Sequence, residues 1–144
     1  MKDEKISLQK PIIISKTVYN QLIEEGRQHL PYEACGFICG CNHVVHSYFP
    51  LKSEIQSTNR FLVGKESIEK AVKSIQKRNE KILAIYHTHP TTSPIPSRID
   101  LLHHPKEEKL DMVIISYKYE QPVLKWYKIM NQNYKECLYE IMID

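Results

Sequence analysis

The chain has 144 residues, of which 42% are hydrophobic and 26% are charged, and its formal net charge is +3. These values are typical of a folded globular protein and exclude a disordered or a fibrous chain. No apolar run approaches the roughly 18–20 residues of a membrane helix, and no basic cluster of the kind that binds nucleic acids is present. The N-terminus, MKDEKISLQK, has no apolar segment typical of a secretory signal. We therefore expect one cytoplasmic domain over residues 1–144, with neither a membrane nor a nucleic acid as partner.

The periodicity of the apolar residues predicts short strands and two substantial helices. One helix is predicted over 15–30, with Ser15 as its cap and Leu30 on its apolar face, and another over 65–79. A short third helix is expected to begin at Ser97. The predicted strands cover 10–14, 34–41, 44–49, 61–63, 82–89, 112–117, 122–129 and 134–143. This order favours an α+β sandwich in which helices cover a sheet.

The most informative stretch is HTHPTTSPIPSRID, which begins at His87. Residues two apart in a strand point to the same face, so His87 and His89 are expected together, on the face that also carries Leu83. Pro90 ends the strand directly afterwards and leaves both imidazoles at its end. Two imidazoles placed in this way can bind one metal ion, at Zn–N distances of about 2.0–2.1 Å.

Asp100 is the expected third metal ligand, because it follows the histidines after a loop stiffened by prolines. Ser97 and Asp100 also fit a helix capping box, and taken alone that is the simpler interpretation. An ordinary pair of strand-end histidines is likewise the simpler interpretation of H-x-H alone. The combination favours a metal, and two histidines with one aspartate leave a fourth position open, as in catalytic zinc sites.

Glu33 is the candidate base for a metal-bound water. It stands directly before an apolar strand, where burial of an isolated carboxylate is costly, although an exposed glutamate at the strand entry is an equally good interpretation. Cys35, next to it, is an alternative ligand. Cys35, Cys39 and Cys41 are expected to be free thiols that pack in the core, with a second metal site as the alternative.

Two separated motifs carry a resemblance to a known family. The first is P-x-E-x-C-G-F over 31–37, and the second is H-x-H-P over 87–90 followed by S-x-x-D over 97–100. Together they resemble the signature of the JAMM (MPN-plus) metalloproteases, in their compact prokaryotic form. The resemblance implies a sandwich of the cytidine-deaminase-like or JAMM type. In that fold a mostly antiparallel, mixed sheet is flanked by two main helices, and a short helix follows the metal-binding strand.

The same resemblance implies a hydrolase of peptide or isopeptide bonds that uses one zinc ion. By position, His87, His89 and Asp100 would bind the zinc. Glu33 would hold and deprotonate the water, and Ser97 would help to stabilise the oxyanion. The implied substrate is a ubiquitin-like or sulfur-carrier β-grasp protein that is cleaved after its Gly-Gly tail, with cysteine, a lysine side chain or a peptide as the leaving group.

Two alternative functions remain open from the sequence. One is a non-catalytic protein-binding scaffold of the same fold, and the other is a small metal- or redox-sensing protein that uses the cysteines and nearby histidines.

A substrate tail is expected to pair with a sheet edge beside the metal-binding strand, where glycine allows close approach. His103 and His104, at the end of the short helix, are expected either as a favourable charge at its C-terminus or as a surface feature. The oligomeric state is left open, with a homodimer as one option.

Overall fold

The computed structural model describes residues 10–106 and 109–144. Residues 1–9, on which the expectation of no secretory signal rests, lie outside the described residues. The described elements are, in order, β1 (Ile12–Ser15), α1 (Lys16–Arg27), β2 (Cys35–Cys41), β3 (Val44–Leu51), α2 (Lys65–Lys77), β4 (Lys81–His89), α3 (Arg98–His103), β5 (Asp111–Ser116), β6 (Val123–Met130), β7 (Asn133–Cys137) and β8 (Tyr139–Met142). Within these ranges, no helix has both the length and the apolar character needed to span a membrane.

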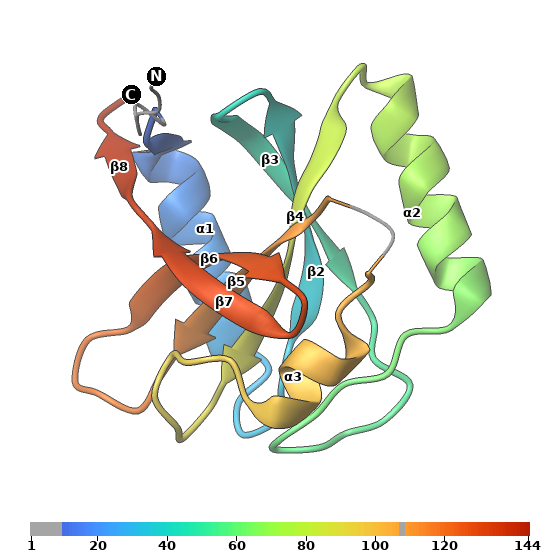
Figure 1. Ribbon diagram of the computed structural model, residues 1–144, viewed down its shortest axis with the longest axis vertical. Helices are drawn as coiled ribbons and strands as arrows, with labels where there is room; N and C mark the ends of the chain where they lie inside the picture. The colour runs from blue at the N-terminus through green and yellow to red at the C-terminus, as the bar shows by residue number, and fades with distance from the viewer. Residues whose placement is uncertain (1–9, 107–108) are drawn as a thin grey trace.

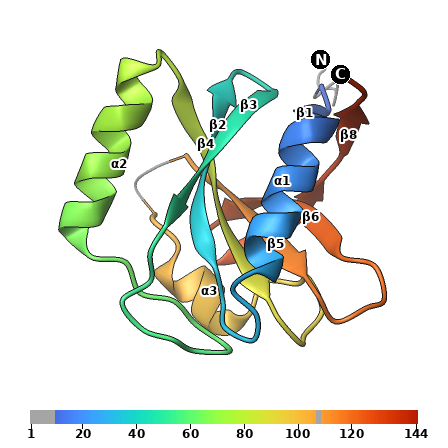
Figure 2. The same ribbon diagram turned by 180° about the vertical axis from the view of Figure 1, so that it is seen from behind.

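The strands form one mixed sheet in the order β7-β6-β5-β4-β2-β3-β1-β8 (Figures 1 and 2). The pairs β2–β3, β2–β4, β5–β6 and β6–β7 are antiparallel, whereas β1–β3, β1–β8 and β4–β5 are parallel. Two main helices flank this sheet and a short helix follows β4, which confirms the predicted α+β architecture. The strand predicted over 134–143 is wrong in one respect. It divides at Leu138, because its first half pairs with β6 at one edge and its second half with β1 at the other.

Local signals set most element boundaries, but the end of the first helix, the position of Leu30 and the strand expected at 61–63 differ from expectation. Ser15 caps α1 as predicted, since its hydroxyl accepts a backbone N–H of the first turn at 3.1 Å. The helix ends before Leu30, which is 37% exposed and does not join the buried face. Segment 61–63 forms no strand. It belongs to the loop between β3 and α2, where the Leu62 N–H donates to Ser53 Oγ at 3.0 Å.

The sheet separates two sets of buried side chains. The face toward α1, here the α1 face, carries one continuous core, formed by Ile14, Leu22, Ile23, Ile38, Val45, Ala84, Tyr86, Val113, Ile115, Leu124 and Trp126. The opposite face, here the α2 face, carries two smaller clusters, formed by Phe37, Cys39, Ala71 and Ile75, and by Met112, Ile114 and Tyr127. In both views α1 and α2 lie on opposite sides of the central strands (Figures 1 and 2).

Strand β4 contributes to both faces in alternation, and this alternation directs its histidines. Tyr86 belongs to the α1 core, whereas Ile85 packs on the α2 face. His87 and His89 continue in phase with Ile85 and therefore lie on the α2 face. Leu83 does not share that face as expected. The register with β2 shifts beside it, and Leu83 packs against the α1 core, because a bulge reverses the alternation.

Candidate metal centre

Three side chains bring their ligand atoms to one point. His87 Nε2 and His89 Nε2 are 3.2 Å apart, and each lies 3.1 Å from Asp100 Oδ2. A tetrahedral zinc ion with bonds of about 2.0–2.1 Å separates its ligands by about 3.3–3.4 Å. The triangle therefore has nearly the size that one shared ion requires. Among residues 10–106 and 109–144, it is the one group of three or more histidine, cysteine or acidic side chains placed to hold a metal.

The interior of the sheet fixes both histidines. Strand β4 lies between β2 and β5, with His87 paired to Cys35 and His89 paired to Ser116. The two imidazoles are only 2% and 5% exposed, respectively. Pro90 follows directly and ends the strand, so the histidines lie where the chain leaves the sheet. A buried but terminal position of this kind supports a rigid site with one open side.

The capping box of α3 fixes Asp100. Ser97 Oγ accepts the Asp100 N–H at 3.0 Å, and Asp100 Oδ2 accepts the Ser97 N–H at 2.9 Å. The same Oδ2 atom faces both histidines, so the capping role and the ligand geometry coexist in one carboxylate. Burial alone would raise the pKa of Asp100, but hydrogen bonds with His87 and His89 outweigh it and hold this pKa well below its usual range.

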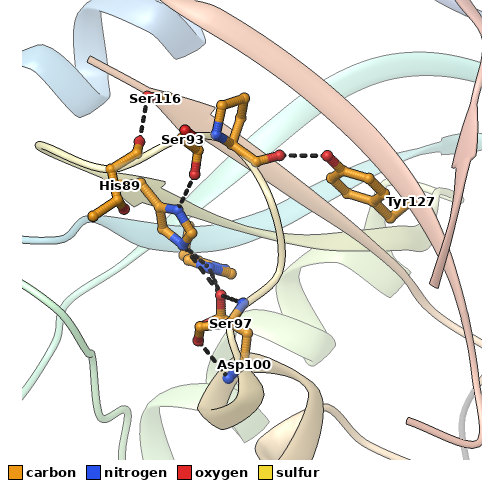
Figure 3. A network of polar contacts seen from close by, with 9 residues as sticks. His89, Ser93, Ser97, Asp100, Ser116 and Tyr127 are labelled. Carbon is orange, nitrogen blue, oxygen red and sulfur yellow. Dashed lines mark hydrogen bonds and ion pairs between the residues drawn. The ribbon is translucent and has the colours of Figure 1, made fainter. Parts of the chain in front are cut away.

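The protonation of His89 indicates that a cation belongs among these atoms. His89 Nδ1 lies 2.8 Å from the Ser93 carbonyl, which can only accept, so Nδ1 carries the hydrogen (Figure 3). In a neutral ring, Nε2 then presents a lone pair to Asp100 Oδ2 at 3.1 Å. Such electron-rich atoms repel one another unless a cation lies between them. Burial lowers the pKa of His89, but the hydrogen bonds with Asp100 and Ser93 and the charges of Asp100 and Glu33 together outweigh it and raise this pKa, so a proton can fill that role. Two imidazoles and a carboxylate also suit zinc.

Glu33 precedes β2, and two hydrogen bonds between Ala34 and Thr88 continue the antiparallel arrangement of β2 and β4 toward it. The Thr88 N–H donates to the Ala34 carbonyl at 3.0 Å, and Thr88 Oγ1 accepts the Ala34 N–H at 2.8 Å. The next antiparallel step pairs Glu33 with His89, on the same face of the sheet. Directly opposed side chains in such a ladder have Cβ atoms about 4.5–5.5 Å apart. The ladder therefore holds the glutamate beside the triangle.

Burial makes Glu33 a weaker acid than an ordinary glutamate. Its side chain is 6% exposed, so the alternative of an exposed glutamate at the strand entry is wrong. Its Oε1 atom is buried, and no group among residues 10–106 and 109–144 forms a hydrogen bond with it. Burial raises the pKa of Glu33 to about 8, while the charge of His89 opposes and that of Asp100 reinforces the shift. This carboxyl group can accept and release a proton near neutral pH.

The loop between β3 and α2 also contributes to the site, and no sequence pattern indicated this. Its Ser57 carbonyl accepts the Glu33 N–H at 2.8 Å. The Phe61 ring lies against the His87 imidazole, with ring centroids 5.3 Å apart and an angle of 32° between the planes. These contacts hold Glu33, the candidate base, and His87, a candidate ligand, from the loop between β3 and α2. Phe61 was expected in a strand and instead packs as part of the wall of the site.

An apolar cavity of about 320 Å³ adjoins the triangle on the α2 face, and His87 and Asp100 form part of its wall. Its other walls come from the sheet, from α2 and from α3, where they include Met112, Ile68 and Ile99. The cavity therefore connects the candidate metal centre with space for a ligand.

The cysteines do not converge on a metal. Cys35 is 1% exposed, its Sγ atom lies 3.8 Å from the Leu51 carbonyl, and burial raises its pKa to about 12. All four cysteines are free; Cys35 and Cys39 are buried as expected, whereas Cys41 is exposed, so the expectation that it packs in the core is wrong. Cys35 is not part of the triangle, and its role as an alternative ligand stays a prediction.

The expectation of a surface position is wrong for His104. It is 7% exposed, and its Nε2 donates to the Leu110 carbonyl at 2.7 Å. This hydrogen bond ties the end of α3 to the segment that leads into β5.

Sequence similarity connects the chain with a family. Residues 15–128 match the family described as prokaryotic homologs of the JAB domain. The desampylase of Pyrococcus furiosus is 30% identical over 69 residues, which are 48% of this chain and 49% of that protein. The chain thus matches about half the length of this curated relative.

Structural similarity extends over nearly the whole chain. A protein of Desulfitobacterium hafniense with a known solution structure has a TM-score of 0.78 and 29% identity, and the match covers 92% of each chain. A protein of Salinibacter ruber has a TM-score of 0.66 and 19% identity, again with 92% of each chain covered. A JAB1/MPN domain protein of Archaeoglobus fulgidus has a TM-score of 0.59 and 18% identity over 94% of this chain and 100% of that chain. The fold is thus the α+β JAB/MPN fold, and the chain belongs to the family of prokaryotic JAB-domain homologues.

Proposed function

We propose that the protein is a zinc-dependent peptidase or isopeptidase of the JAMM type. The observation that carries this proposal is the buried Oε1 atom of Glu33 beside the triangle of ligand atoms, which has no hydrogen-bond partner within the described part of the chain. A buried carboxylate without a partner is costly, and it is rare in a part of a protein that serves only stability. Next to a metal centre, the same group is a general base with a free oxygen atom. The partial similarity to a desampylase also supports the proposal of a peptidase or isopeptidase.

The residues divide the chemical work. His87, His89 and Asp100 would hold one zinc ion and leave its fourth position open. When bound, zinc supplies a water of lowered pKa and polarises the scissile carbonyl. Glu33 accepts the proton of the attacking water at Oε1 and passes it to the leaving nitrogen, which its pKa of about 8 permits. Ser97 accepts the Asp100 N–H at its oxygen, so its own hydrogen can be donated to the oxyanion.

The structure changes the expected route of the substrate. In the part of the chain that the structure describes, β4 is paired on both sides, so neither of its own edges is free for a tail to extend. The apolar cavity next to His87 and Asp100 offers the alternative path. We propose that the C-terminal tail of a ubiquitin-like or sulfur-carrier β-grasp protein enters the site along this cavity. Its terminal Gly-Gly would lie at the metal, where a Cβ atom would hinder close approach.

The decisive experiment separates metal binding from hydrolysis. Glu33→Gln keeps the shape of the side chain but removes its basicity, so zinc should stay bound while hydrolysis falls about 10²–10⁴-fold. His89→Ala should lose both zinc and hydrolysis. Glu25→Gln is the matched control, because Glu25 is also partly buried with a raised pKa but lies on α1. Near-normal turnover in Glu33→Gln would overturn the role of this base.

The same assay tests the substrate. Conjugates of a β-grasp protein whose tail ends in Gly-Gly, Ala-Ala or Val-Val are offered to the zinc-loaded enzyme. Cleavage of the Gly-Gly conjugate alone supports the tail proposal. Equal cleavage of all three contradicts it and leaves the hydrolase assignment intact. Failure to cleave any conjugate or peptide, with zinc bound, would instead favour a non-catalytic scaffold.

A further inference from the structure

The loop over residues 90–96 links His89 to α3, and three buried side chains hold its backbone (Figure 3). The consecutive carbonyl groups of residues 92–94 each accept a hydrogen bond. Ser116 donates to the first at 2.6 Å, His89 to the second at 2.8 Å, and the Tyr127 hydroxyl to the third. The loop therefore lies where β5 and β6 place it.

Within the loop, the Ile95 N–H donates to the Ser93 carbonyl at 2.8 Å, so this carbonyl accepts from both Ile95 and His89. The loop also contains Pro90, Pro94 and Pro96, which have no backbone N–H to donate. Ser116 and Tyr127, by contrast, belong to β5 and β6, which are each paired on both sides, and they are 0% and 4% exposed. Their hydroxyl groups hold the carbonyls on either side of Ser93, so they tie the loop to the sheet and help to set where the Ser93 carbonyl meets the imidazole of His89.

The hydrogen bond between the Ser93 carbonyl and His89 decides which nitrogen of the imidazole carries the hydrogen and which is free to bind a metal. The hydrogen on Nδ1 is directed to the Ser93 carbonyl, which frees Nε2 toward Asp100. If the carbonyl moved away, the ring could carry its hydrogen on Nε2 instead, and that nitrogen could not bind a metal. Partners of this kind, which orient a histidine ligand through its other nitrogen, typically change metal affinity about 10–100-fold when they are removed.

We propose that Tyr127, together with Ser116, is a positioning residue of the metal centre. Tyr127 does not contact the candidate ligands itself. Its hydroxyl donates to the Pro94 carbonyl and so holds the neighbouring Ser93 carbonyl in place. The Ser93 carbonyl then determines which nitrogen of His89 carries the hydrogen. The inference rests on the proposed function, since it takes the triangle to be a zinc site. No motif of the sequence includes Tyr127, which lies in β6 on the same face of the sheet.

Tyr127→Phe tests the proposal by removing one hydroxyl group. Tyr139→Phe is the matched control, because the Tyr139 hydroxyl donates to the Leu124 carbonyl at 2.7 Å and does not touch the loop. Zinc affinity is measured by competition with a chelator, and the hydrogen position on His89 is measured by nitrogen NMR of the imidazole in metal-free protein at alkaline pH, where the ring is neutral. Both variants should lower the melting temperature to a similar extent.

Of the two tyrosine variants, Tyr127→Phe alone should weaken zinc binding, by about 3–10-fold because it acts through the loop, and it alone should shift the His89 ring toward hydrogen on Nε2. Ser116→Ala should change both readouts in the same direction. A Tyr127→Phe protein that is less stable but has wild-type zinc affinity and a wild-type His89 spectrum would overturn the proposal. If the wild-type protein bound no zinc, the proposed function would fail, and the His89 spectrum would still decide the role of Tyr127.

Discussion

The two faces of the sheet are made by the same strands but differ in how completely they are filled. The α1 face is one continuous core in which Tyr86 and Trp126 are fully buried. The α2 face has two small clusters, an apolar cavity and the buried, unpartnered oxygen of Glu33. The filled face stabilises the fold, although among the described residues its Tyr86 hydroxyl also has no hydrogen-bond partner, and the incomplete face keeps room and one unsatisfied carboxyl oxygen beside the candidate metal centre. Departures of this kind from ideal packing are expected at functional sites, with stability supplied elsewhere.

The largest expected difference between the faces concerns two neighbours in β5. Ile114 and Ile115 are both 0% exposed, but Ile115 lies in the α1 core and Ile114 in a small cluster on the α2 face. Ile115→Ala should lower the free energy of unfolding by about 4–5 kcal/mol, because the continuous core cannot collapse around the void. Ile114→Ala should cost about 2–3 kcal/mol, because its looser surroundings can relax. Urea unfolding of the two variants measures both values, and equal losses would contradict the comparison.

Gly26 tests how closely α1 packs on the sheet. Replacement of a helical glycine by alanine normally stabilises by about 0.5–1 kcal/mol. Here a Cβ atom would overlap the Tyr117 hydroxyl and lie 2.8 Å from Thr88 Cγ2, so we expect Gly26→Ala to destabilise by about 1–3 kcal/mol. If the clash with the Tyr117 hydroxyl causes this loss of stability, the double variant Gly26→Ala with Tyr117→Phe should recover part of it. A stabilised Gly26→Ala protein would show that the α1 face is less tightly filled than described.

The pH dependence of metal-free protein tests the incomplete face. Glu33 has its pKa raised from 4.5 to about 8, mainly by burial. The folded state therefore holds this proton more tightly than the unfolded state, so the associated stability is complete below about pH 4.5 and is lost as the pH rises through about 8. Glu33→Gln should lack this loss, so its melting temperature should exceed that of the wild type most at alkaline pH. Parallel melting profiles for the two proteins would show that the carboxyl group is not desolvated.

The smallest effect is expected for the rim of the cavity. Ile99 and Ile95 are each 52% exposed, but only Ile99 lines the cavity beside Asp100. Ile99→Ser should raise KM for the tail conjugate about 3–10-fold, because apolar contact with the substrate is lost. Ile95→Ser, the matched control, should leave KM unchanged, and neither exposed substitution should alter the melting temperature appreciably. Identical KM values in the two variants would place the tail elsewhere.

The histidine pair, the capping box and the order of elements could be predicted because each depends on residues close together in the chain. Ser15 caps a helix through the turn that directly follows it. His87 and His89 share a face because strand side chains alternate, and the single Asp100 carboxylate serves both α3 and the triangle. Alternation failed at Leu83, since a bulge depends on how β4 pairs with β2 and has no pattern of its own.

The sequence by itself determined the family signature, the helices and the identity of the groups that could meet a metal. Only the tertiary structure decided the burial of Glu33, the packing of Phe61 on His87, the division of the last strand at Leu138 and the hold of Tyr127 on the loop. Local signals act through neighbours along the chain, whose geometry the backbone fixes. Burial and hydrogen bonds between distant segments follow from the closure of the whole sheet, which brings residues far apart in sequence into contact.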